Sequence, residues 1–163
     1  MPFIIDTSSI IHAWDTYPES QFPKVWQWIA EELKSENLII FQTAFDELAS
    51  PDLRKFIKSH TKPVPVTSGV VEKAKSIEGQ LGIKNGIYAP KGVSENDIFI
   101  IAHAALLRSD DQNVVLLTEE SEQAQLPKEQ RKYKIPAVCR EVTEPSILCE
   151  NFLTYLKQSK QVF

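Results

Sequence analysis

The sequence predicts an α/β protein of three layers, α/β/α, in which helices cover both faces of a central parallel sheet of about four or five strands. Three short apolar runs, Phe3–Ile5, Leu38–Phe41 and Val114–Leu117, are typical of strands that are buried on both faces. Segments with apolar residues at helical spacing lie between these runs. Strands that alternate with helices in this way favour a parallel sheet.

Length and composition fit one folded domain over residues 1–163. Of the 163 residues 42% are hydrophobic, so the chain can bury a core. The net charge of −4 argues against a sequence-reading DNA-binding domain, but not against a nuclease whose metal ions neutralise phosphate. The start M-P-F-I-I-D has no signal-peptide pattern, and no apolar stretch reaches about 20 residues. We therefore expect a cytoplasmic protein that does not associate with membranes.

Helix starts are predicted at residues that suit an N-cap or a first turn. In chain order they are Ser8 or Ser9, Pro23, Thr43, Pro51, Ser68 and Ser94. Thr43 with Asp46, and Ser94 with Asp97, have the spacing of a capping box. The helix that follows Ser94 has almost no polar face, so we expect it to be central, and to end at residues 109–111.

Weaker patterns concern the loops and the C-terminal part. Residues 64–66 are a poor strand, and Gly82–Gly92 is predicted to be a loop because of its Asn-Gly pair and its proline. Ala137–Cys139 is predicted to be an edge strand, and a last helix is expected from about Pro145 through Leu156. The two cysteines, at 139 and 149, are expected to be reduced.

Four acidic residues, Asp6, Glu47, Asp97 and Glu120, lie where predicted strands give way to helices. A carboxylate beside a buried strand must be paired, hydrogen-bonded or metal-bound, and no basic residue is an obvious partner in sequence. Ligands of open parallel sheets bind beyond the carboxyl ends of the strands, so one fold can bring all four together. Because Mg²⁺ and Mn²⁺ prefer oxygen ligands, the pattern predicts a divalent-cation site at which an activated water attacks a phosphodiester.

Simpler interpretations stay open for each of the four. Asp6 and Asp97 could serve only as helix caps, and Glu47 could be a solvated helix residue. Neighbouring acids also compete for two positions: Asp46 with Glu47, and Glu119 and Glu122 with Glu120.

Other polar and aromatic residues also carry two interpretations. Histidines and tryptophans on apolar helices are expected in the core or at its rim, with base stacking as the alternative for the tryptophans; they are His12, His103, Trp14, Trp26 and Trp28. The basic stretch Lys128–Lys134 is either a solvated loop or a guide for an RNA backbone, with Tyr133 stacking on a base. Lys84 and Lys91 are candidates for phosphate contacts if the Gly82–Gly92 loop lies near the site; the alternative is a loop with no role in function.

The motifs Asp6-Thr7-Ser8, a mid-chain Glu47, Asp97 at the start of an apolar helix and Thr118-x-Glu120 resemble, in this order, the PIN domain superfamily. That superfamily consists largely of metal-dependent ribonucleases and includes the VapC toxins. The resemblance covers roughly residues 2–156. The segments at 26–28 and 134–139 look like a poorly characterised bacterial branch of it.

The resemblance implies a PIN-like fold that cleaves single-stranded RNA with Mg²⁺ or Mn²⁺. It implies that the four acids hold the metal and that Ser8 and Thr118 support the site. It also implies the toxin of a toxin–antitoxin pair, with a small antitoxin protein and a homodimer among the partners. Many members carry Asp where Glu120 stands, and this longer side chain is expected to reach a metal through water.

Two other functions remain as alternatives. One is a non-catalytic PIN-like binding module that keeps an acidic pocket. The other is a phosphatase with Asp6 as nucleophile, although Ser8 stands where such enzymes usually carry a second Asp.

Overall fold

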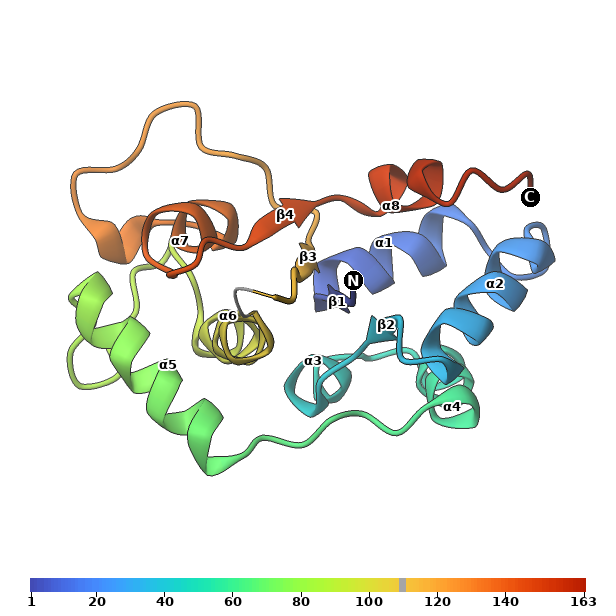
Figure 1. Ribbon diagram of the computed structural model, residues 1–163, viewed down its shortest axis with the longest axis horizontal. Coiled ribbons are helices and arrows are strands. Elements are labelled where there is room, and N and C mark those ends of the chain that lie inside the picture. The colour runs from blue at the N-terminus through green and yellow to red at the C-terminus, as the bar shows by residue number, and fades with distance from the viewer. Residues whose placement is uncertain (109–110) are drawn as a thin grey trace.

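A four-stranded parallel sheet lies at the centre of the computed structural model, which describes residues 1–108 and 111–163 (Figure 1). The strand order is β2-β1-β3-β4, and every pairing in it is parallel. The strands are β1 (Phe3–Ile5), β2 (Leu38–Ile39), β3 (Val115–Leu117) and β4 (Leu148–Glu150). The predicted α/β class with a parallel sheet of four strands is therefore confirmed.

Helices flank the sheet on both sides. Figure 1 shows α5, α6 and α7 gathered on one side of the strands and α1, α2, α4 and α8 on the other. Their bounds are α1 (Thr7–Thr16), α2 (Pro23–Lys34), α3 (Gln42–Asp46), α4 (Pro51–His60), α5 (Ser68–Leu81), α6 (Glu95–Leu107), α7 (Ile135–Glu141) and α8 (Phe152–Gln158), with a 3₁₀ turn at Gln130–Lys132. None of these helices is long and apolar enough to cross a membrane, among the residues described.

The core lies between the sheet and the helices. All three residues of β3 are buried, and α6 buries residues at positions around most of its circumference, from Ile98 to Ala104. The predicted central position of this helix is thus confirmed. Because β3 and α6 are both covered, residues at their ends can be held in fixed positions relative to one another.

Several helix starts differ from the prediction by one or two residues. Asp6 caps α1 in place of Ser8 or Ser9, since its side chain accepts a hydrogen bond from the Ser8 backbone. Thr67 caps α5 in place of Ser68. Thr43 caps nothing: it lies inside α3, and its buried hydroxyl has no hydrogen-bond partner among the residues described. Short polar side chains stand next to one another at these turns, so composition alone does not select the capping one.

The predicted edge strand Ala137–Cys139 is wrong, because these residues form part of α7. The actual edge strand is β4, within the stretch from Pro145 that was assigned to the last helix. That helix, α8, begins only at Phe152, after Asn151 caps it through the Thr154 backbone at 2.8 Å. The three residues of β4 are Leu, Cys and Glu, and none of them is fully buried. This strand therefore lacks the continuous apolar run that marks a central strand.

The remaining boundaries follow the pattern closely. Gly82–Gly92 contains no regular element after Gly82, which ends α5 with a left-handed backbone conformation. The second strand is shorter than expected, and Phe41 forms only an isolated parallel bridge to Val64. The predicted end of the apolar helix at 109–111 falls mostly on residues 109–110, which lie outside the described residues.

Candidate functional site

Asp6 follows β1 directly and is almost completely buried, with 4% of its surface exposed. Its Oδ2 accepts a hydrogen bond from the Ser8 hydroxyl at 2.6 Å and another from the Thr118 hydroxyl at 3.4 Å. The Ser8 backbone N–H donates to the same oxygen at 3.4 Å. Asp6 is therefore both the cap of α1 and a carboxylate fixed at the end of the central strands.

Ser8 and Thr118 tie the ends of β1 and β3 together. Their hydroxyl oxygens lie 3.4 Å apart. The Ser8 hydroxyl accepts a hydrogen bond from the Glu119 backbone at 3.1 Å, and the Thr118 hydroxyl accepts one from the Glu120 backbone at 3.2 Å. Both predicted supporting residues thus contact Asp6 and fix the turn that carries Glu120.

Asp97 opens α6, where its Oδ2 accepts a hydrogen bond from the Ser94 backbone at 2.8 Å. The Ser94 hydroxyl in turn accepts one from the Asp97 backbone at 3.2 Å, which completes a capping box. The capping role that the spacing predicts is therefore present. It does not remove the carboxylate from the site, because Asp97 is only half-buried and its charge acts on three other acids, as described below.

Glu47 lies at the C-cap of α3, one residue past the end of this short helix. It is exposed, and two polar residues outside the predicted set hold its side chain. Thr7 Oγ1 lies 3.3 Å from Glu47 Oε1 and 3.4 Å from the Ala44 carbonyl oxygen, and Asn96 also hydrogen-bonds to the Glu47 carboxylate. Thr7 follows Asp6 directly, and Asn96 directly precedes Asp97. This proximity to a predicted acid is the one feature of the sequence that points to them.

Glu120 and Glu119 leave β3 in different directions. The Glu119 carboxylate accepts hydrogen bonds from the Ser9 hydroxyl at 3.0 Å and from the Phe152 backbone at 2.9 Å, so it connects α1 to the start of α8. Glu120 instead accepts a hydrogen bond from the Ile135 backbone at 2.8 Å, at the start of α7. Glu119 therefore has a structural task, whereas Glu120 lies where it interacts with Asp6 and Asp97.

Asp6, Glu47, Asp97 and Glu120 share one electrostatic environment, and we call them the acidic region. Burial raises the pKa of each. The charge of Asp97 raises the pKa values of the other three further, and the charge of Asp6 does the same for Glu47 and Glu120. Hydrogen bonds, such as that from Ser8 to Asp6, offset part of this rise. Carboxylates that repel one another in this way lie close together in space.

Cations balance this charge only weakly. No Lys or Arg forms an ion pair with the acidic region within the described ranges 1–108 and 111–163, although Lys134 lowers the pKa of Glu120. The starts of α1, α6 and α7 each meet one of the acids through a backbone N–H. The partial positive charge of these helix ends favours carboxylates there, but amounts to less than one full charge each.

The carboxylates do not form a ready-made metal cage. In the described part of the chain, no three His, Cys, Asp or Glu side chains are grouped closely enough to hold an ion together.

Several other predicted candidates lie elsewhere. His103 is buried and stacks on Phe41 with ring centroids 3.6 Å apart, and burial lowers its pKa to about 4. Trp26 and Trp28 are buried in aromatic contacts, and Tyr133 is 8% exposed, so these rings cannot stack on a nucleotide base. The core interpretation therefore holds for these buried rings, and the burial of Tyr133 argues against the stacking alternative.

Comparisons with known proteins give a family and a fold. The family described as "Domain of unknown function (DUF4411)" matches residues 3–163, so the chain belongs to this family. No curated protein matches the chain. A chain in the crystal structure of VapBC2 from Rickettsia felis, bound to a DNA fragment from their promoter, has a similar fold. The TM-score is 0.51 at 14% identity, and the likeness covers 93% of this chain and 99% of that one.

Proposed function

We propose that this member of the DUF4411 family is a PIN-like, metal-dependent endoribonuclease that cleaves single-stranded RNA. One observation carries the proposal: burial raises the pKa of four carboxylates from distant parts of the chain, and the charges of Asp6 and Asp97 raise the pKa values of Glu47 and Glu120 further. Repulsion of this kind costs stability, and acids with perturbed pKa values gather at functional sites. A divalent cation would offset the repulsion.

The donor set suits a hard cation. All four side chains offer carboxylate oxygens, the ligands that Mg²⁺ and Mn²⁺ prefer. The absence of a three-residue cage in the described residues is compatible with this, because Mg²⁺ is usually held by one or two carboxylates together with waters and substrate phosphates. When bound, such an ion supplies a water of lowered pKa and neutralises charge on the phosphodiester.

The residues of the acidic region would then divide their tasks. Asp6 and Asp97, which lie at the ends of a buried strand and a buried helix, hold the cation. Ser8 and Thr118 orient the Asp6 carboxylate through hydrogen bonds of 2.6 and 3.4 Å, and thereby limit its movement. Glu47 is exposed and can accept a proton from an attacking water, while Glu120 completes the negative environment.

A toxin of a toxin–antitoxin pair is the biological setting that we propose. The likeness to the VapBC2 chain supports the fold that such a role needs, and at 14% identity it supports only that. A short reading frame next to the gene, whose product co-purifies with this chain, would support a small antitoxin partner. Analytical ultracentrifugation of the purified chain would test the homodimer that the family resemblance implies.

The decisive experiment compares the parent with the double variant Asp6→Asn, Asp97→Asn. We expect cleavage of single-stranded RNA in Mn²⁺ to disappear in the double variant while its circular dichroism spectrum is unchanged. Asp46→Asn is the matched control, since Asp46 neighbours Glu47 but is exposed and bonds only to Gln42 Nε2 among the described contacts. Equal cleavage by the parent and the double variant would refute the proposal.

A non-catalytic binding module that keeps an acidic pocket is the second candidate, and the absence of a three-residue metal cage among residues 1–108 and 111–163 favours it. Titration calorimetry with Mn²⁺ separates the two functions. Binding that Asp6→Asn abolishes supports the nuclease, whereas no binding in the parent supports the module.

A further inference from the structure

The acidic region cannot hold an RNA strand by itself, because its negative charges repel the phosphates. A nuclease of this kind needs cations close to the site that are not already neutralised. The stretch Lys128–Lys134, which the sequence suggested for this task, meets this requirement only in part. Arg131 and Lys132 both pair with Glu129, at 2.6 and 3.3 Å.

Helix α4 carries cations that have no acidic partner among the described residues. Arg54, Lys55 and Lys58 take part in no ion pair within the described residues. Together with Pro51 and Ser59 they line an open hollow of about 500 Å³. Arg54 and Lys58 are four residues apart, so they lie one above the other on the same face of the helix.

This hollow begins beside the acidic region. Arg54 Nη1 donates to the carbonyl oxygens of Phe45, at 3.3 Å, and Leu48, at 3.2 Å. Glu47 lies between these two residues in the chain, at the end of α3. Arg54 therefore joins the start of α4 to the turn that carries one of the four acids.

The hollow offers charge but no surface for base recognition. Arg54 Cζ lies 4.5 Å and Lys58 Nζ 5.3 Å from the centre of the Phe45 ring, which is only 1% exposed. The ring therefore holds the two cations in place and cannot stack on a base. Contacts to phosphates alone position a strand without reading its sequence.

On this basis we propose that the face of α4 formed by Arg54, Lys55 and Lys58 binds the phosphate backbone of single-stranded RNA next to the acidic region. The inference rests on the proposed function for the identity of the ligand. Binding through this face is independent of base sequence and depends strongly on salt, because each phosphate contact releases a counterion.

The test measures binding of a fluorescent single-stranded RNA by anisotropy, without divalent metal, over a range of salt concentrations. The variant is Lys55→Gln, Lys58→Gln; Arg54 is left intact because it also caps α3. We expect binding to weaken about tenfold at low salt, and the slope of log K against log salt to become shallower by about 1.4, or about 0.7 per lost contact. A variant with the affinity and the slope of the parent would overturn the inference.

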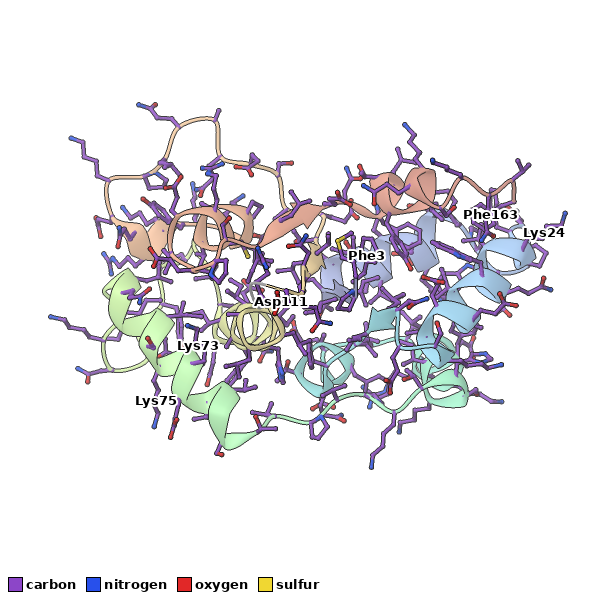
Figure 2. All side chains as sticks on the ribbon, viewed as in Figure 1. Phe3, Lys24, Lys73, Lys75, Asp111 and Phe163 are labelled. Carbon is purple, nitrogen blue, oxygen red and sulfur yellow. The ribbon has the colours of Figure 1, made fainter. Side chains whose placement is uncertain are left out.

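A matched control comes from α5. In Figure 1, α3 and α6 lie between this helix and α4. Lys73→Gln, Lys75→Gln removes the same charge from that helix, where Figure 2 labels both side chains. We expect this control to bind RNA like the parent. An equal loss in the control would show that net charge matters and not α4, and it would overturn the inference, as would a parent that binds no RNA.

The outcomes separate this inference from the proposed function. A parent that binds RNA through α4 but cleaves none in Mn²⁺ keeps the binding surface and refutes the nuclease. A parent that cleaves RNA, with a KM that the α4 variant leaves unchanged, keeps the nuclease and refutes the binding surface.

Discussion

Two sets of charged side chains, both beyond the ends of the strands, balance their charge in opposite ways. In residues 122–141 several acids and bases are paired: Arg140 contacts Glu141 at 2.8 Å and also pairs with Glu122, and Glu129 pairs with Arg131 and Lys132. In the acidic region no described ion pair exists, and burial and repulsion raise the pKa values. Exposed ion pairs contribute little to stability, whereas buried like charges reduce it. The comparison supports the proposal that a ligand balances the charge of the acidic region.

The largest expected effect follows from changing the most buried acid. Asp6→Asn keeps the shape and loses the charge, so we expect RNA cleavage to fall by more than the roughly 10–100-fold that removing an outer partner of a metal ligand costs. Initial rates in Mn²⁺ measure it. Glu122→Gln, in the paired set, should retain the rate of the parent. Similar losses in both variants would break the distinction between the two sets.

A smaller loss is expected when the support of Asp6 is weakened. Thr118→Val removes a hydroxyl that lies 3.4 Å from Asp6 Oδ2 and that accepts the Glu120 backbone N–H. Activity should fall by roughly 10–100-fold, because the carboxylate is less well oriented. Thr118→Ser should restore most of it, since the hydroxyl is retained. No rescue by Ser would assign the loss to packing.

The pH dependence of stability should show two opposing contributions. In the acidic region the folded-state pKa values are raised, so the contribution to stability is present at low pH and is lost as pH rises through those values. His103 acts in the other direction. Its pKa falls to about 4 from the ordinary value of 6.5, so the folded state disfavours its protonation, and stability decreases as pH falls from about 6.5 towards 4.

His103→Leu separates these contributions. In urea unfolding without metal, the parent should lose about 2 kcal/mol between pH 8 and pH 5 through this histidine, given about 1.4 kcal/mol per pKa unit. The variant should lack this loss. The difference in unfolding free energy between the parent and the variant should therefore be smaller at pH 5 than at pH 8, or change sign. A difference that is the same at both pH values would contradict the assignment of a buried neutral His103.

The smallest effect is expected in the paired set. Arg140→Gln breaks both of its exposed ion pairs, and such pairs often contribute nothing measurable. We expect the melting temperature and the cleavage rate to stay as in the parent. A large drop in either would show that residues 122–141 do more than solvate the surface.

Much of the fold could be predicted from local patterns. The continuous apolar runs gave β1 and β3, and the almost wholly apolar stretch after Ser94 gave the central helix α6. These patterns are reliable because burial on all sides leaves no polar positions. The edge strand was missed because Leu148–Glu150 is half exposed, and its residues resemble the first turn of the next helix. Ala137–Cys139 was mistaken for that strand because short apolar runs occur in both element types.

The sequence by itself determined the α/β class, the central strands and helix, and the acidic residues that stand where those elements end, because each depends on a few neighbouring residues. Only the tertiary structure decided that Glu119 connects α1 to α8 while Glu120 interacts with Asp6 and Asp97, and that Arg54 of α4 bonds to the turn that carries Glu47. The task of Glu119 depends on contacts between segments that are far apart in the chain, with Ser9 at a separation of 110 residues and Phe152 at a separation of 33. Chain packing sets such contacts, and no local pattern encodes them.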